Sequence, residues 1–166
     1  PRRLACGDRR AMCYTLRHTM PARRLPGLGV RLRRARRTDL PALRALLRRP
    51  ARPGEQRFDR RFVTDLGHDA YLAQDGTGAV VGVVGIVYVR SLACGRWRAV
   101  LDVLRARDAA LADALLAFAE ERARRRGCST LEAWPLEPSD PLLDAVAARG
   151  WHSGLAGRMK TLEEPS

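Results

Sequence analysis

Residues 99–112 carry the pattern in this sequence that is best suited to bind an anion. Residues 99–104 are apolar and β-branched enough for a buried strand, and a helical pattern follows almost at once. Asp108 is placed to cap this helix. Where a strand turns directly into a helix, the unpaired N–H groups at the helix start can hold an anion such as a pyrophosphate. An ordinary turn within a folded core has the same pattern, so both interpretations stay open.

Three further side chains are candidates for moving a proton. Asp102 lies on the strand before the turn, Glu132 lies on a strand that follows the helix, and His152 comes directly after Trp151. A carboxylate can accept a proton, and a histidine titrates near neutral pH. The alternative for Asp102 and Glu132 is a solvated carboxylate on a strand face. The alternative for His152 is a histidine at the surface or at a sheet edge.

The elements that must position these residues form one strand–helix–strand unit over residues 98–135. Four apolar residues of its helix recur at the spacing of one helix face: Leu111, Leu115, Phe118 and Ala119. Gly127 is suited to end the helix, because glycine adopts the left-handed conformation that closes the last turn. Before this unit, the apolar runs 70–74 and 80–89 flank a turn at residues 75–78 and predict an antiparallel hairpin.

The whole chain predicts one α/β domain, of the α+β type, over residues 30–162. The order of predicted elements is β, α, α, β, β, β, α, β, α, β. The first strand covers residues 30–35, and the first helix carries one apolar stripe: Leu40, Leu43, Leu46 and Leu47. This order predicts a mixed, mostly antiparallel sheet that is flanked by helices. Residues 163–166 are expected to form a short tail.

Length and composition restrict the class of protein. The chain has 166 residues, of which 46% are apolar, and this is enough for one domain with a sizeable core. It contains no run of about 18 apolar residues, so no membrane span is expected. Its four cysteines form no CxxC pair, so neither a zinc site nor a disulfide framework is expected. We therefore expect a cytoplasmic protein with reduced thiols and no bound metal.

The net charge of +13 is confined to the first third of the chain. Residues 1–61 carry a net charge of +15, and residues 62–166 carry −2. Residues 1–29 show no sustained periodicity and are expected to form a disordered basic arm; Met20 is a candidate for the native start, and a transit peptide is an alternative. A basic arm can also bind nucleic acid, but aromatic residues for stacking are sparse, so this function is the least favoured.

Four segments, taken in order, resemble the GNAT superfamily of acetyl-CoA-dependent N-acyltransferases. They are VRLRRARRTDLPALRALL, AYLAQDGTGAVVGVVGIVYV, DALLAFAEERARRRGCSTLEAW and AARGW. The resemblance covers about four-fifths of the chain and rests on the order and spacing of these segments. It implies a GNAT-like fold, acetyl-CoA as the acyl donor, and an amine of a small molecule or a protein as the acceptor.

In this family, a loop with the pattern Q/R-x-x-G-x-G/A holds the pyrophosphate of the acyl-CoA through its backbone N–H groups. The resemblance implies cofactor binding by the corresponding loop and the strand before it: Val103, Leu104, Arg105, Arg107, Asp108, Ala109, Ala110, Leu111 and Ala112. Ala110 departs from the pattern, because glycine is needed there for close approach of the backbone. The loop is also about three residues short, and the charge of Asp108 would repel a phosphate.

The family mechanism is direct attack of a deprotonated amine on the thioester, with a base, backbone donors for the oxyanion and an acid for the leaving thiolate. The resemblance implies Asp102 as the base, with Glu132 as the second choice. The family's acid is a tyrosine at the position that Val146 occupies here, four residues before Gly150. Because this tyrosine is absent, His152 is the candidate substitute as acid or base.

Three functions follow from these observations. The first is an N-acyltransferase that moves an acetyl group from acetyl-CoA to a primary amine. The second is a GNAT-like binding or regulatory domain that has lost catalysis, because the departures all fall on cofactor or catalytic positions. The third is nucleic-acid binding through residues 1–61. Exchange of strands or helices between protomers, as is common in such folds, makes a homodimer a further expectation.

Overall fold

The strands of this protein form one sheet. The computed structural model describes residues 22–48, 67–92, 95–133, 145–147, 149 and 151. Its six strands lie in sequence order across the sheet: β1 (Arg23–Leu25), β2 (Val30–Arg34), β3 (His68–Gln74), β4 (Val80–Ser91), β5 (Arg96–Ala106) and β6 (Cys128–Ala133). β5 and β6 are parallel, and the other neighbouring strands are antiparallel. The predicted mixed, mostly antiparallel sheet is confirmed.

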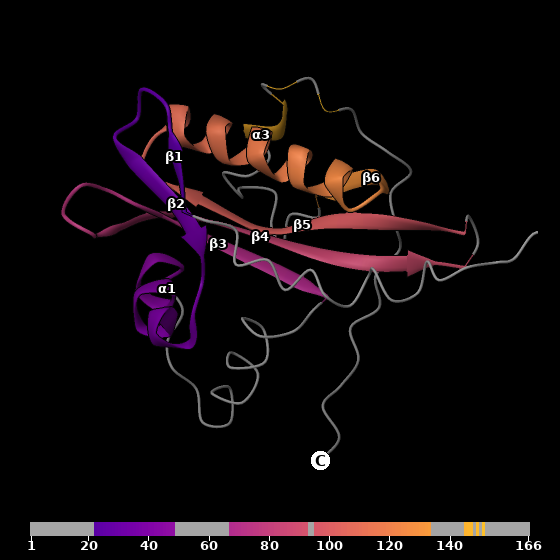
Figure 1. Ribbon diagram of the computed structural model, residues 1–166, viewed down its shortest axis with the longest axis horizontal. Coiled ribbons are helices and arrows are strands. Elements are labelled where there is room, and N and C mark those ends of the chain that lie inside the picture. The colour runs from indigo at the N-terminus through magenta and orange to yellow at the C-terminus, as the bar shows by residue number, and fades with distance from the viewer. Residues whose placement is uncertain are drawn as a thin grey trace, which may run out of the picture.

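Helices cover both faces of the sheet. A short 3-10 helix, η2 (Arg37–Asp39), leads into α1 (Leu40–Leu46), and α3 (Ala109–Arg125) connects β5 to β6. Figure 1 shows α3 along one face of the sheet and α1 against the other. In the described part of the chain, no helix is both long enough and apolar enough to cross a membrane.

Each helix packs through the apolar stripe that the sequence predicts. Leu111, Leu115 and Ala119 of α3 are fully buried in one cluster, which we call the α3-face core. Leu43 of α1 is buried with Leu72 in a second cluster, the α1-face core. The helix ends are also as expected, since Asp108 is the N-cap of α3 and Gly127, after its last turn, has a φ of 71°. Periodicity and caps together therefore specify this unit.

The helix α3 lies so close to β4 that residue 82 has no room for a side chain. A Cβ atom at Gly82 would lie 3.0 Å from the carbonyl oxygen of Arg105 and 3.1 Å from Cδ2 of Leu111. A glycine within a strand often marks such a close approach. This contact fixes the start of α3 against the end of β5, where the sequence predicts an anion site.

The folded part of the chain begins earlier than the sequence suggests. The sequence places residues 23–25 in a disordered arm, whereas the structure shows them as β1, paired with β2. The reason is the burial of Leu25, which joins Val30 in the α3-face core. Residues 1–21, the second predicted helix and the closing strands after Trp151 lie outside the described residues.

Candidate functional site

The strands β5 and β6 run side by side only along the first half of β5. From Trp97 to Leu101, β5 pairs with residues 128–133 of β6. It then continues to Ala106 as a neighbour of β4. Within the described residues, the β6 side of β5 therefore has no strand partner after Leu101. An open strand edge of this kind presents a row of backbone N–H and C=O groups to whatever lies beside it.

Asp102 is the extra residue of a β-bulge at the point where the two strands separate. The adjacent residues Gly85 and Ile86 of β4 pair with Val103 and Leu101, so Asp102 stands between two paired positions. A bulge bends its strand and re-aims the side chain that it carries. The side chain of Asp102 is exposed. The structure thus places an exposed carboxylate at the start of the open strand edge.

Glu132 lies close to this point but is engaged in an ion pair. It pairs in register with Val100, one position before Leu101. Arg98 of β5 donates from Nε to Oε1 of Glu132 over 2.8 Å, and Thr130 donates its hydroxyl to the same oxygen over 3.2 Å. The carboxylate therefore fastens β6 to β5. A role for Glu132 in proton transfer would require the pair with Arg98 to open.

The carboxylate of Asp108 caps the start of α3. Oδ1 of Asp108 accepts a hydrogen bond from the N–H of Leu111 over 2.8 Å, and Oδ2 accepts one from Nε of Arg107 over 2.9 Å. The Leu111 N–H, followed by Arg107, holds the pKa of Asp108 below its usual value. Arg107 also donates from Nη2 to the carbonyl oxygen of Leu28 over 3.3 Å. Both charged side chains of the turn are thus occupied by contacts within the protein.

Most of the other predicted cofactor-binding residues contact the core or the backbone of the protein itself. Leu104 and Leu111 are buried in the α3-face core, and Val103 packs against the α1-face core. Arg105 donates from Nη1 to the carbonyl oxygen of Leu104 over 2.8 Å. The N–H of Ala112 bonds to the carbonyl oxygen of Asp108 over 3.1 Å, as in any helix.

The turn in this conformation does not fit a pyrophosphate. Ala109 and Ala110 are exposed in the first turn of α3, but the carboxylate of Asp108 already lies at its N–H groups. A second anion at the same N–H groups would meet that charge directly. In the described residues, the β6 side of β5 beyond Leu101 carries no such charge conflict with a bound anion, but it has no helix N-terminus either.

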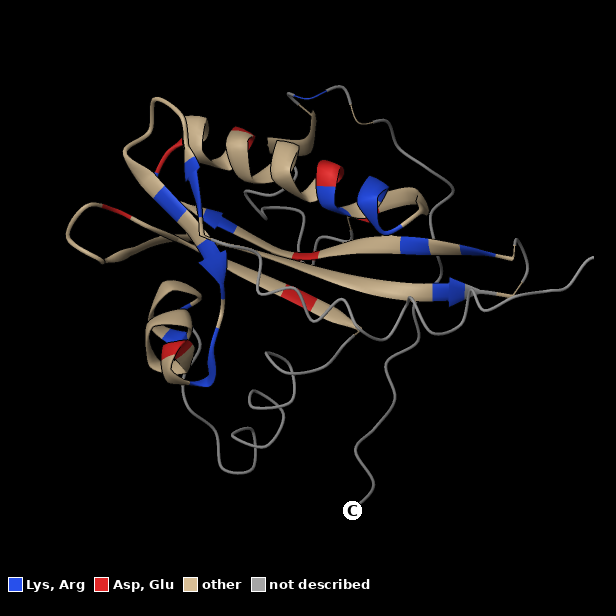
Figure 2. Ribbon diagram, in the orientation of Figure 1, with Lys and Arg blue, Asp and Glu red and all other residues tan. Residues whose placement is uncertain are grey.

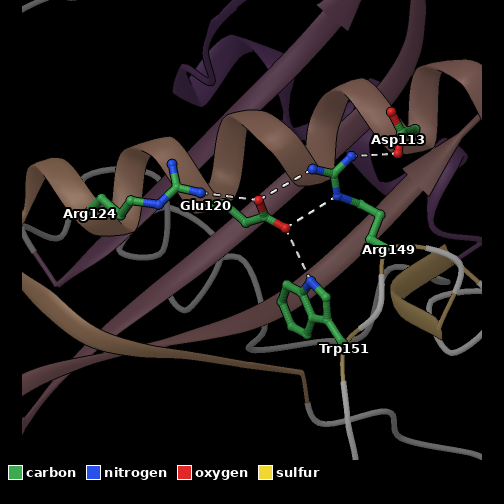
Figure 3. A network of polar contacts seen from close by, with 5 residues as sticks. All are labelled: Asp113, Glu120, Arg124, Arg149 and Trp151. Atoms are coloured by element: carbon green, nitrogen blue, oxygen red, sulfur yellow. Dashed lines mark hydrogen bonds and ion pairs between the residues drawn. The ribbon is translucent and has the colours of Figure 1, made fainter.

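The side chains of Arg149 and Trp151 are fastened to α3 through Glu120 (Figure 3). Trp151 donates from Nε1 to Oε1 of Glu120 over 3.1 Å, and Arg149 donates to both carboxylate oxygens. Arg149 also donates from Nη1 to Oδ1 of Asp113 over 2.6 Å. Burial opposes the charge of Glu120, but the bonds from Arg149 and Trp151 outweigh it and lower the pKa of Glu120. Arg149 and Trp151 are therefore attached to α3 through its acidic side chains.

Of the two remaining predicted positions, Val146 and His152, the structure describes only Val146. Val146, at the position of the family's tyrosine, is buried in the α3-face core with a relative exposure of 8%. It is a core residue and has no acidic proton to give. His152 follows the anchored Trp151 but lies outside the described residues, so its role stays a prediction.

A buried polar cluster around Asp69 was not found from the sequence. Asp69 of β3 has an exposure of 0%, and it accepts hydrogen bonds from the hydroxyl of Tyr88 over 3.0 Å and from Nε of Arg122 over 2.9 Å. Two more guanidinium groups approach it, from Arg126 at 3.3 Å and from Arg34 at 3.4 Å. The one signal in the sequence is an aspartate directly before the apolar run of residues 70–73. The cluster joins β3 to the last turn of α3, on the face opposite α1.

The basic residues of the first third that the structure describes are partly neutralised. Figure 2 shows arginines on β1 and β2 at one edge of the sheet, and more at the end of α3. Arg23 pairs with Glu121 at 2.6 Å, and Arg33 pairs with Asp39 at 2.7 Å. Binding of nucleic acid by residues 1–61 stays a prediction. In the described ranges, no group of His, Cys, Asp and Glu is arranged to hold a metal ion.

Several solved structures with the same arrangement of strands and helices are described as acetyltransferases. A ribosomal-protein-alanine N-acetyltransferase from Brucella melitensis biovar Abortus 2308 aligns with a TM-score of 0.65 and 17% identity, over 80% of this chain and 99% of that chain. A GNAT family acetyltransferase from Staphylococcus aureus aligns with a TM-score of 0.65 and 15% identity, over 81% of this chain and 100% of that chain.

One similar structure has a different description. A transcriptional regulator from Bacillus halodurans C-125 aligns with a TM-score of 0.68 and 23% identity, over 80% of this chain and 99% of that chain. No protein-family model and no curated protein sequence matches the chain. At these identities the likeness concerns the fold: this chain has the GNAT fold, as its sequence predicts. Its activity has to be argued from the site.

Proposed function

We propose that this protein is an N-acetyltransferase that transfers an acetyl group to a primary amine of a small molecule or a protein. The observation that carries the proposal is the exposed carboxylate of Asp102 on a bulge at the start of the open edge of β5. This arrangement brings a base next to backbone groups that can hold an extended acyl donor. The acetyltransferases with the same fold support acetyl-CoA as the donor.

Asp102 is the proposed general base. An amine is mostly protonated at neutral pH and cannot attack a carbonyl until it loses a proton. The carboxylate of Asp102 accepts that proton, directly or through a water molecule. Acetyl-CoA, when bound, supplies a thioester carbonyl that is open to attack. The ion pair between Glu132 and Arg98 holds β6 to β5 just before the strands separate, and so fixes the point where the open edge begins.

No general acid is needed for the proposed reaction to proceed. Val146 is buried and apolar, so the departing thiolate receives no proton from that position. A thiolate is a good leaving group because a thiol has a pKa near 8.5 and is partly ionised at neutral pH. His152 stays a proposed alternative acid. Its substitution by alanine would slow the reaction with poor acceptor amines if it serves in this way.

The experiment that tests the proposal is release of thiol from acetyl-CoA in the presence of a panel of amines. We expect release above background for at least one class of amine, and a loss of about 100-fold or more in kcat when Asp102 is replaced by asparagine. Glu121→Gln is the matched control, since it removes one carboxylate charge at the far end of α3. Equal rates for Asp102→Asn and the control would refute the assignment of the base.

A second candidate function is a binding domain without catalysis. The specific observation in its favour is that Asp108 occupies the start of α3, while Val146 replaces the family's acid. The likeness to a protein described as a transcriptional regulator is consistent with it. Saturable binding of CoA without turnover of any amine would favour this function over the first.

A further inference from the structure

Two carboxylates lie near the start of α3. Asp108 caps the helix, and Asp75 lies in the turn between β3 and β4. Bonds from Thr77, and more weakly the charge of Arg107, hold the pKa of Asp75 below its usual value. Both carboxylates are therefore ionised at neutral pH, and the nearby Arg107 is already paired with Asp108 at 2.9 Å. The N–H groups at the start of α3 therefore already face a carboxylate of the chain itself, which disfavours a second anion there.

Binding at the open edge of β5 does not require a positive charge. An acyl-pantetheine arm is a chain of two amides that ends in a thioester, and it needs only backbone donors and acceptors beside it. The edge beyond Leu101 presents such groups within the described residues. The structure thus separates the two halves of an acyl-CoA: the edge suits the arm, and the turn does not suit the diphosphate.

We propose that Asp108 determines the donor specificity of this protein, so that acyl thioesters on a pantetheine arm without a diphosphate bind about as tightly as acetyl-CoA. This inference rests on the proposed function and concerns the same site. Asp108 acts by occupying the Leu111 N–H and by placing a negative charge where the diphosphate of CoA would lie. In most strand-to-helix anion sites the diphosphate adds affinity, and here its contribution is cancelled.

Coulomb's law sets the size of the effect. One carboxylate charge about 5 Å from the two charges of a diphosphate, in water, weakens binding by about tenfold. The value for water applies because the side chain of Asp108 is 46% exposed. The effect should shrink as salt is added, since the Debye length falls from about 30 Å at 0.01 M to about 3 Å at 1 M.

Calorimetric titration with free CoA and with pantetheine tests this inference. The variant is Asp108→Ser, because serine is also a good N-cap and preserves the helix start. The control is Glu121→Gln, which removes the same charge about 15 Å along the helix, ten residues after Leu111. Circular dichroism checks that all three proteins are equally folded. The titrations are made at low and at high salt.

Comparable dissociation constants for the two probes in the unchanged protein would support the inference. In Asp108→Ser we expect CoA to bind about tenfold more tightly and pantetheine to bind as before, with the gain reduced at high salt. Glu121→Gln should change neither constant by more than about twofold.

Two outcomes overturn the inference and can be told apart. A preference for CoA over pantetheine of tenfold or more in the unchanged protein, unaffected by Asp108→Ser, would show that Asp108 moves aside without cost; the proposed acetyltransferase function would stand. Failure of both probes to bind to either protein would overturn the proposed function as well.

Discussion

Among substitutions that remove one side-chain charge in the described residues, Asp69→Asn should destabilise this protein most. Asparagine has nearly the same shape but no charge, so the packing stays and only the electrostatic contacts change. Asp69 is fully buried, with guanidinium groups at 2.9, 3.3 and 3.4 Å. Without its charge, the three guanidinium groups would face one another across a neutral amide.

The expected loss follows from the exposure of the partners. Removal of one partner from a buried ion pair costs about 3–5 kcal/mol. Arg122 is only 18% exposed and loses the buried carboxylate at 2.9 Å, whereas Arg126 and Arg34 are about a third exposed and can turn towards water. We therefore expect about 3 kcal/mol, the lower end of the range, which is more than a 100-fold change in the folding equilibrium constant.

Unfolding in urea, followed by circular dichroism, measures this loss. Asp113→Asn is the matched control, because Asp113 makes one ion pair with Arg149 and its side chain is 60% exposed. Such a surface pair contributes about 1 kcal/mol or less. If Asp69→Asn lost no more stability than Asp113→Asn, the cluster would not hold β3 to α3, and the reasoning from burial would be wrong.

Three more results are expected. Gly82→Ala should cost about 1–2 kcal/mol in urea unfolding, because the new Cβ meets the Arg105 carbonyl oxygen at 3.0 Å and backbone cannot yield easily; unchanged stability would show that α3 shifts freely. Glu120→Gln should lower the stability by about 1 kcal/mol and increase hydrogen exchange around Trp151, since the charged acceptor for its indole N–H is lost. Stability should fall as pH drops below about 4.5, because the pKa values of Glu120 and Asp39 are lowered by folding, so that the protein gains from these groups only while they are ionised. At the alkaline end, burial and the charge of Asp69 raise the pKa of Tyr88 above 10.0, so its contribution is present below pH 10.0 and is lost above it; a flat profile at both ends would contradict these shifts.

Local patterns were sufficient to predict the strand–helix–strand unit. The helical spacing of Leu111 and Leu115, the cap at Asp108 and the glycine after the last turn all depend on residues a few positions apart, and the structure confirms each of them. The same holds for the hairpin of β3 and β4, where a turn separates two apolar runs. Such signals survive in a single sequence because neighbouring residues decide them.

The contacts that escaped prediction join residues far apart in the chain. Asp69 meets Arg122 and Arg126 across 53 and 57 positions, and no local pattern states that three guanidinium groups will converge on one strand residue. β1 was missed for a similar reason, since its three residues include two arginines and form a strand only because β2 pairs with them. For Asp108, the sequence predicted both the cap and the repulsion of phosphate; the structure adds that Arg107 is paired with the same carboxylate.

The bulge in β5 sets the proposed base, Asp102, apart from the residues that form the core. On β5, Ala99, Leu101, Leu104 and Ala106 all belong to the α3-face core, while Val103 belongs to the other face. If residue 102 were deleted, these side chains would alternate strictly and each would keep its face. The alternation of side chains between the two faces of β5 therefore does not require Asp102. The carboxylate can therefore be altered or lost while the core stays as it is, and the residue that we propose as the base is free to vary without cost to the fold.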